Sequence, residues 1–352
     1  MKKQILLVLI SFSILTACKN KTKENTVELE DVVVSSKEVN VYTHRHYPSD
    51  QELFARFETE TGITVNVVNA SADELMQKMT QEGDQSPADV LITVDAGRLV
   101  RASDGNLLQS VSSEKLNNTI PAHLRDENGQ WFGLTKRARV IAYAKDRVSK
   151  EELSSYENLA NAKWKGKILV RSSENIYNQS LMASIIANNG EEVAQGWASK
   201  VLDNMARSPR GNDRDQVKAV VAGLGDIAIV NTYYIGKLLN SHNPAEVEAG
   251  EGVGIFFPNQ DGRGTHINIS GAGVAKYAPN KENAIAFIEF LASEEAQEVF
   301  AKTNYEYPVN PKVEPSKLLA SWGSFKEDTL ALSALGKNNK RAVMLFDRVG
   351  WK

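Results

Sequence analysis

The first folded part of the sequence alternates between strands and helices, and this alternation restricts the folds open to the chain. Residues 39–43 alternate apolar and polar side chains as a strand does, and residues 63–68 and 88–93 predict two further strands. Amphipathic segments at residues 50–61 and 73–82 predict helices between them. This β-α-β-α-β order, with helices of about ten residues, predicts parallel strands joined by right-handed crossovers.

A second region of the chain repeats the same order. Residues 168–173 predict a strand, and residues 178–188 predict the helix that follows it. A helix predicted at residues 214–222 precedes the short apolar run at residues 227–230, which has the composition of a buried parallel strand. At 352 residues the chain has room for about two domains. We therefore expect an α/β protein with two lobes that face each other.

Two long runs of strand character separate these regions and suit connections between lobes. The run at residues 133–143 carries three cationic side chains in four residues. Because we do not expect so charged a strand to be central to a core, we interpret it as a crossover whose cations face a cleft. A solvated edge strand protected by its charges explains Lys136 and Arg139 equally well. Residues 149–159 predict a linker helix, and residues 265–275 alternate as expected for the return crossover.

Tyrosines recur where predicted strands end and helices begin. Tyr47 and Tyr177 each stand at such a junction, and Tyr233 and Tyr234 follow the buried strand together. Ligands bind at the carboxyl ends of strands in open α/β sheets. Phenolates are hard anionic oxygen donors that suit a trivalent metal, although a tyrosine can also simply pack with its hydroxyl bonded. For the adjacent pair alone both interpretations stand, and the recurrence at three strand ends favours a metal site.

Composition and motifs exclude several function classes. The 41 basic and 44 acidic residues give a formal charge of −3 with no basic block, which argues against a nucleic-acid surface. The sequence contains no G-x-S-x-G elbow, no H-E-x-x-H motif, no phosphate-binding glycine loop and no cysteine nucleophile. A hydrolase or transferase that uses Tyr and His therefore has no local support, and we predict a protein that is not an enzyme.

The N-terminus has the features of an export signal. Two lysines precede an apolar segment at residues 5–15 that is too short to span a bilayer. The sequence Leu-Thr-Ala-Cys ending at Cys18 resembles a bacterial lipobox, and this cysteine is the only one in the chain. We expect a signal peptide at residues 1–17 and a lipidated, flexible tether at residues 18–38, with the alternative that Cys18 is a free or buried thiol. The mature protein would then be exported and membrane-anchored, facing the periplasm or the extracellular side.

Six motifs together are similar to the ferric-iron-binding proteins of bacterial ABC uptake systems, most closely to the cyanobacterial-type subgroup. The similarity covers about residues 39–352. The motifs are Arg45-His46-Tyr47, Ser86-Pro87-Ala88-Asp89-Val90-Leu91, Trp131-Phe132-Gly133-Leu134-Thr135-Lys136-Arg137-Ala138-Arg139-Val140, Tyr177-Asn178-Gln179-Ser180, Asn231-Thr232-Tyr233-Tyr234 and Phe257-Pro258-Asn259-Gln260.

This resemblance implies a metal site and the residues around it. Four tyrosines match the ligands of the family, and they are Tyr47, Tyr177, Tyr233 and Tyr234. His46 matches a position that ligates iron in some members and stands aside in others. Arg137 matches a cleft arginine near the ligands, and Lys237 replaces an arginine that often follows the tyrosine pair, with the loss of planar bidentate hydrogen bonding.

The resemblance also implies the architecture and the function. It implies a two-lobed periplasmic-binding-protein fold of type II, in which each lobe is a mostly parallel sheet flanked by helices and a cleft lies between them. We place the first lobe at residues 39–135 plus 265–304 and the second at residues 136–264 plus 305–352. The expected protein is a monomer that binds Fe(III) and delivers it to a membrane ABC permease. A binding protein for another solute, an anion or a polyamine held by Arg137 and cleft aromatics, is the alternative.

Overall fold

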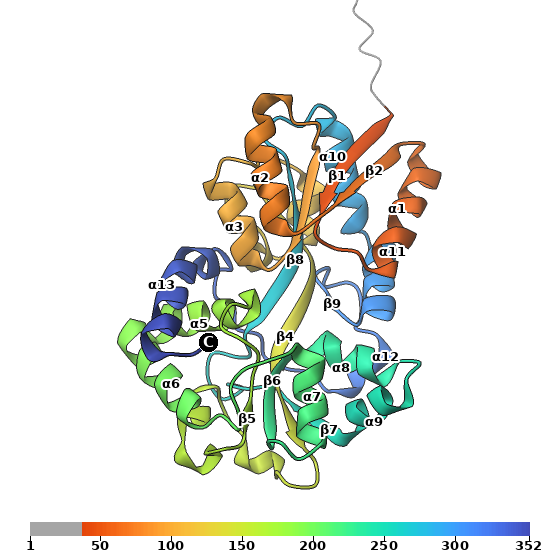
Figure 1. The fold of residues 1–352 in the computed structure, drawn as a ribbon. Coiled ribbons are helices and arrows are strands. Elements are labelled where there is room, and N and C mark those ends of the chain that lie inside the picture. Colours follow the sequence, from red (N-terminus) through yellow and green to blue (C-terminus); the bar gives the residue numbers. More distant parts are fainter. Residues whose placement is uncertain (1–36) are drawn as a thin grey trace, which may run out of the picture. The chain divides into compact units, whose positions relative to one another are not determined.

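The computed structural model describes residues 37–352, and the segment Ser36–Lys352 forms one compact unit. The predicted signal peptide, Cys18 and nearly all of the predicted tether lie outside the described residues. Thirteen α-helices and nine strands make up the described part of the chain (Figure 1). No helix in that part has the length and apolar character needed to cross a membrane. These elements confirm an α/β protein.

The N-terminal strands form the parallel end of a nine-stranded sheet. Strand β1 (Glu38–Thr43) pairs in parallel with β2 (Thr64–Asn69) and with β3 (Val90–Val94). Helices α1 (Pro48–Thr61) and α2 (Ala72–Glu82) make the two crossovers. This is the predicted β-α-β-α-β order, with element ends that differ from the prediction by a few residues.

The other end of the sheet is built from the second predicted region. Strand β6 (Ile227–Asn231) is buried along its whole length and pairs in parallel with β5 (Ile168–Leu169). Helix α5 (Ile176–Asn189) follows β5, and α7 (Asp213–Val221) precedes β6. Strand β5 is therefore shorter than the strand predicted at residues 168–173.

Two long strands connect the ends of the sheet, whose order is β2-β1-β3-β8-β4-β6-β5. Strand β4 (Phe132–Ala144) pairs antiparallel with β8 (Ile267–Val274) through one part of its length and with β6 through the other. Strands β7 (Val253–Phe256) and β9 (Tyr307–Pro308) also pair with β4. The two predicted crossovers are thus the central strands of one continuous sheet.

The prediction that so charged a strand is not central to a core is wrong. Strand β4 lies inside the sheet, and the side chains of Arg137 and Arg139 are both 2% exposed. The alternative of a solvated edge strand is wrong as well, since Arg139 is buried in an ion pair with Asp213. Only Lys136 stays partly exposed, where its ammonium pairs with Glu327. A buried counter-charge from a distant part of the chain thus allows Arg139 in the interior of the sheet.

The remaining helices cover both faces of the sheet at each end (Figure 1). Their bounds are α3 (Ala96–Asp104), α4 (Glu114–Thr119), α6 (Glu191–Asp203), α8 (Thr232–Leu239), α9 (Pro244–Gly252), α10 (Lys281–Leu291), α11 (Glu294–Val299), α12 (Lys317–Ser321) and α13 (Ser333–Val349). The predicted linker helix at residues 149–159 is wrong, because that segment forms two short 3-10 turns at Lys150–Glu152 and Glu157–Ala160. The last helix, α13, packs against α3, α5 and α6.

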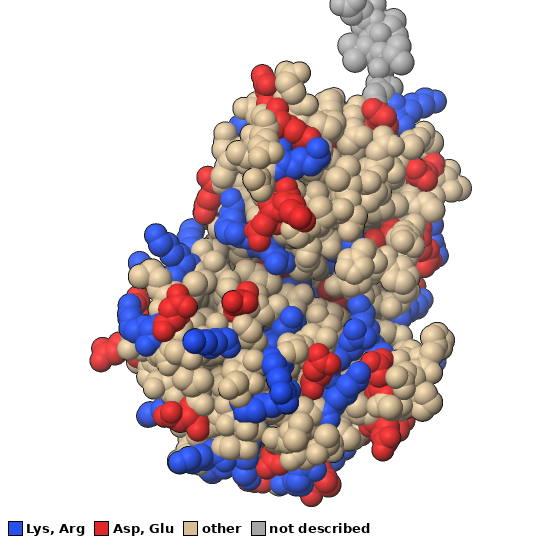
Figure 2. Space-filling model, viewed as in Figure 1, with Lys and Arg blue, Asp and Glu red and all other residues tan. Residues whose placement is uncertain are grey.

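The surface of the described residues shows no continuous basic patch on the face drawn in Figure 2, where basic and acidic side chains are interspersed. A nucleic-acid surface would gather Lys and Arg along one face or groove.

Candidate metal centre

The tyrosine pair lies in the first turn of α8, directly after the buried strand β6. The backbone N–H of Asn231, the residue that precedes this helix, donates to Asp213 Oδ2 at 2.8 Å. The ring centroids of Tyr233 and Tyr234 are 4.3 Å apart, and Tyr233 is buried whereas Tyr234 is partly exposed. Strand β6 and the start of helix α8 therefore fix the direction in which the side chains of Tyr233 and Tyr234 leave the backbone.

Tyr177 reaches the same place from the start of α5. Asn175 caps this helix by accepting a hydrogen bond from the backbone N–H of Tyr177 at 3.1 Å. The hydroxyl of Tyr233 donates to the hydroxyl of Tyr177 at 3.2 Å. Two helix starts that are 56 residues apart in sequence thus bring three phenols together.

Tyr47 stands at the start of α1 and joins this group from the other end of the sheet. Its backbone N–H donates to Asp50 Oδ2 at 3.4 Å, and Pro48 opens the helix. The Nζ of Lys237 lies 4.0 Å from the centroid of the Tyr47 ring and 5.3 Å from that of Tyr233. Lys237 therefore lies between the two rings, and all four predicted tyrosines share one neighbourhood.

His46 is the predicted ligand that stays at the edge. Its side chain is exposed, and its ring centroid lies 5.7 Å from that of Tyr47. No contact joins it to the other three tyrosines among residues 37–352. The structure therefore brings four of the five predicted ligands together and leaves His46 beside them.

Three of the four phenols are held in their neutral form by their surroundings. Burial raises the pKa of Tyr47, Tyr233 and Tyr234 above the usual value for tyrosine, and repulsion from the neighbouring Tyr177 oxygen adds to the rise in each case. A metal ion that binds here has to displace these protons, and its own positive charge supplies the driving force.

Three arginines surround the Tyr177 ring, with their Cζ atoms 5.5 to 5.9 Å from its centroid. Asp213, fully buried, accepts from Arg139 at 2.7 Å and from Arg171 at 3.2 Å. The predicted neighbour Arg137 differs from these two, because its Nε and Nη2 are buried without a hydrogen-bond partner among the described residues. Its positive charge is thus available to offset negative charge on the phenols.

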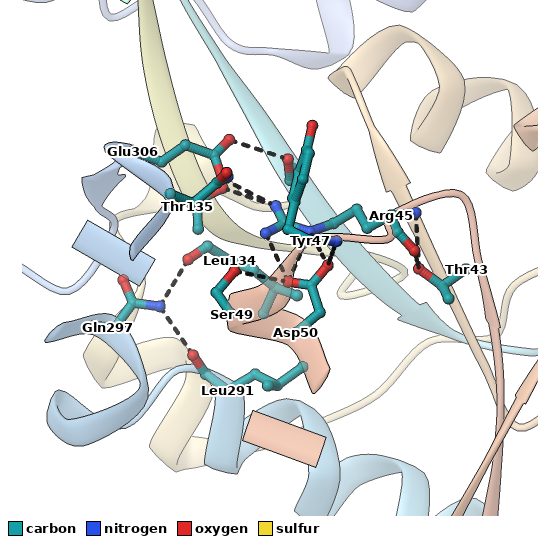
Figure 3. A network of polar contacts seen from close by, with 12 residues as sticks. Thr43, Arg45, Tyr47, Ser49, Asp50, Leu134, Thr135, Leu291, Gln297 and Glu306 are labelled. Carbon is teal, nitrogen blue, oxygen red and sulfur yellow. Dashed lines mark hydrogen bonds and ion pairs between the residues drawn. The ribbon is translucent and has the colours of Figure 1, made fainter. Parts of the chain in front are cut away.

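A buried polar network that the sequence did not reveal lies beside Tyr47 (Figure 3). The Arg45 guanidinium pairs with Asp50 at 2.9 Å and with Glu306 at 3.2 Å. Burial opposes ionisation of Glu306, yet Arg45 and Arg137 hold the pKa of its carboxyl below the usual range. Arg45 appeared in the sequence only as part of a motif. Glu306 carried no signal, because it lies 261 residues from its partner.

The candidate donors that this site brings together are phenols. Among the described residues no group of three or more His, Cys, Asp and Glu side chains is placed to hold a metal ion. Four phenol oxygens next to compensating cations suit a small, highly charged, hard cation rather than a soft one. Burial lowers the pKa of Lys237, the cation between the rings, to about 8.

Comparison with known proteins places this geometry in context. The chain is 49% identical to iron uptake protein A1 of Synechocystis over 98% of this chain and 95% of that protein. It is 53% identical to a solved structure of Trichodesmium IdiA (FutA) in complex with iron and citrate, with a TM-score of 0.87 over 90% of this chain and all of that one. It is 47% identical to the solved ferric binding protein from Campylobacter jejuni, with a TM-score of 0.85 over 89% of this chain and all of that one.

Fold and site together define a solute-binding protein with the type II periplasmic-binding-protein fold, and not an enzyme. The chain belongs to the bacterial extracellular solute-binding protein family, whose model matches residues 52–327. The predicted fold class and the predicted family are confirmed.

Proposed function

We propose that this protein is an extracytoplasmic lipoprotein that binds Fe(III) through tyrosine phenolates and delivers it to an ABC permease. The main observation behind the proposal is that the side chains of Tyr47, Tyr177, Tyr233 and Tyr234 lie together. Beside them lies Arg137, two of whose nitrogens have no hydrogen-bond partner among the described residues. The names of similar proteins support the choice of metal, since they are an iron uptake protein, a ferric binding protein and a protein solved with iron.

Charge balance supports a ferric ion in this proposal. Three phenolates neutralise Fe³⁺, and a fourth leaves one surplus negative charge that Arg137 and Lys237 can offset. His46 contributes less than any tyrosine, because a neutral imidazole is a softer donor than a phenolate and water can take its place.

The proposal includes closure of two lobes around the metal. With the first lobe at residues 39–135 plus 265–304 and the second at residues 136–264 plus 305–352, Tyr47 belongs to the first lobe and the other three tyrosines to the second. Iron bound by all four would bridge the lobes and favour the compact form, as in other hinged binding proteins. We expect a monomer to suffice, because one chain supplies the whole donor set.

Titration with ferric citrate tests the metal site. Fe³⁺–phenolate bonds absorb visible light, so the parent protein should become coloured as iron binds. Tyr233→Phe and Tyr234→Phe keep the ring and remove one donor, so each should weaken binding severely and shift or bleach the band. Tyr277→Phe, on an exposed residue, is the matched control and should bind like the parent. Parental binding and colour in both site variants would show that the proposed iron site is wrong.

Lipidation of Cys18 is a separate part of the proposal. Its support is the lipobox-like sequence and the absence of any other cysteine in the chain. Cys18→Ser should release soluble protein or leave an uncleaved precursor, as judged by fractionation of the producing cells. Parent protein found wholly in the soluble fraction with an unmodified Cys18 would exclude the anchor.

Anion binding is the second candidate function, favoured by the two Arg137 nitrogens, Nε and Nη2, that have no hydrogen-bond partner among the described residues. A polyamine is disfavoured, because three guanidinium groups already surround Tyr177. The two candidates differ in colour: an anion bound without iron gives no visible band. Calorimetric binding of citrate alone, with no band when iron is added, would favour the anion.

A further inference from the structure

The Arg45 side chain is fixed by two buried carboxylates on opposite sides (Figure 3). Its Nε and Nη2 donate to Asp50, with the shortest contact at 2.9 Å, and its Nη1 donates to Glu306 at 3.2 Å and to Thr135 at 3.3 Å. Arg45 is 3% exposed and Glu306 2% exposed. A guanidinium with this many directed partners has one orientation, because its donors form a rigid planar fork.

This guanidinium is also packed between two aromatic rings. Its Cζ lies 4.8 Å from the centroid of the Tyr47 ring and 5.2 Å from that of Phe300. The Tyr47 hydroxyl has no hydrogen-bond partner among residues 37–352, so ring contacts decide where the phenol oxygen points. One of those contacts comes from Arg45 and another from Lys237.

Glu306 is a counter-charge for the guanidinium on the Tyr47 ring. It pairs directly with Arg45 at 3.2 Å. Asn304 donates to it at 2.5 Å and Ser270 at 3.4 Å, which hold the carboxylate in place.

The same carboxylate connects Tyr47 to the other tyrosines. Ser270, which donates to Glu306, accepts a hydrogen bond from Arg137 Nη1 at 3.4 Å. Arg137 lies over the Tyr177 ring at 5.6 Å. A continuous set of contacts therefore runs from Tyr47 through Glu306 to Tyr177.

We propose that Glu306 is a positioning residue for iron capture: by holding Arg45 against the Tyr47 ring, it directs the Tyr47 oxygen toward the other phenols. This proposal rests on the proposed function, in which Tyr47 is an iron ligand. Glu306 itself does not touch the metal. Its effect is exerted through Arg45 and is limited to the contribution that Tyr47 makes.

A purely structural role for Glu306 predicts a different result. If Glu306 only neutralised a buried arginine, its loss would lower the stability of the fold. Any change in iron affinity would then be the same with and without the Tyr47 hydroxyl. If it positions Tyr47, its loss should have no further effect on iron once the Tyr47 hydroxyl is absent. Residues that act as a unit show such non-additivity in a double-mutant cycle.

The test is a cycle of Glu306→Gln, Tyr47→Phe and the double variant, each titrated with ferric citrate. We expect Glu306→Gln to weaken Fe³⁺ binding by about tenfold in the parent, as the loss of a charge-assisted hydrogen bond implies, and to move its visible band toward that of Tyr47→Phe. In the Tyr47→Phe background the same change should leave affinity and band unaltered. Asp89→Asn is the matched control, since this buried carboxylate bonds Asn40 and Asn280 and contacts none of the tyrosines.

Each outcome decides the matter. Equal effects of Glu306→Gln with and without the Tyr47 hydroxyl, or parental iron binding by Glu306→Gln, would overturn the positioning role. A parent protein without an iron-dependent band would instead refute the proposed function. If Glu306→Gln melts far below the control, the cycle is run with Arg45→Lys, which keeps the charge and loses the planar fork. Additivity of Arg45→Lys with Tyr47→Phe would overturn the proposal in the same way.

Discussion

Iron binding by neutral phenols should release protons, and their number can be derived from the site. Burial raises the pKa of Tyr47, Tyr233 and Tyr234, so these three hydroxyls carry their protons at neutral pH in the iron-free protein. Each of them that becomes a ligand must lose its proton to the solvent.

The expected release from these three tyrosines is therefore about three protons per iron at pH 7. By linkage, the affinity for free Fe³⁺ should rise with pH by about three decades per pH unit, which is about 4 kcal/mol of binding free energy per unit. Acid should correspondingly expel the metal over a narrow pH range, because protons compete at several oxygens at once.

The assay adds ferric citrate to weakly buffered protein and measures the base needed to hold the pH constant. The donor complex contributes its own protons, and comparison with Tyr234→Phe removes that contribution. This variant lacks one titrating oxygen and should release about one proton fewer per bound iron. Tyr277→Phe should release as many as the parent. Equal release by the parent and by Tyr234→Phe, at equal iron occupancy, would refute the reasoning that iron deprotonates the phenol of Tyr234.

Three further predictions concern the iron-free fold. Tyr233→Phe removes the hydrogen bond between the phenols of Tyr233 and Tyr177 and should change the free energy of unfolding in urea by about 1 kcal/mol or less. A loss of unfolding free energy several times larger would show that this hydroxyl has a structural role. Asp213→Asn leaves Arg139 and Arg171 buried without their counter-charge and should lower the free energy of unfolding by about 3 to 5 kcal/mol in the same assay. A variant as stable as the parent would show that Asp213 is not needed as their counter-charge. Burial lowers the pKa of His266 to about 3. Below pH 6.5 this imidazole therefore binds a proton in the unfolded chain but stays neutral in the folded protein. Stability should fall by up to about 1.4 kcal/mol for each pH unit from this group, and His266→Gln should have a shallower acid dependence than the parent if the assignment is right.

The order of strands and helices could be predicted because it depends on local periodicity. The three N-terminal strands, the two crossover helices between them and the buried strand before the tyrosine pair were all found within a few residues. The predicted strand at residues 168–173 was too long for a tertiary reason. Asn178 Nδ2 donates to the carbonyls of Arg171 and Ser172, which turns the chain toward α5 instead of extending the strand.

The place of charge inside the fold could not be predicted from local sequence. Arg139 looked like a residue of an edge strand, because its partner Asp213 is 74 residues away. Glu306 was missed for the same reason. The tyrosines were found because each stands at the start of a helix that follows a predicted strand. The joint use of the tyrosines as ligands remains a prediction.

Asp213 has a kinetic consequence for a site of this kind. Its carboxylate holds Asn231 before the tyrosine pair and two of the three arginines around Tyr177, so it ties two helix starts together. Parts that are held in place before any metal arrives lower the entropy cost of capture. Only Tyr47 comes from the other end of the sheet. Residence time should then depend on how often Tyr47 withdraws, and a partner that pulls this one side chain away could empty the site without unfolding the rest.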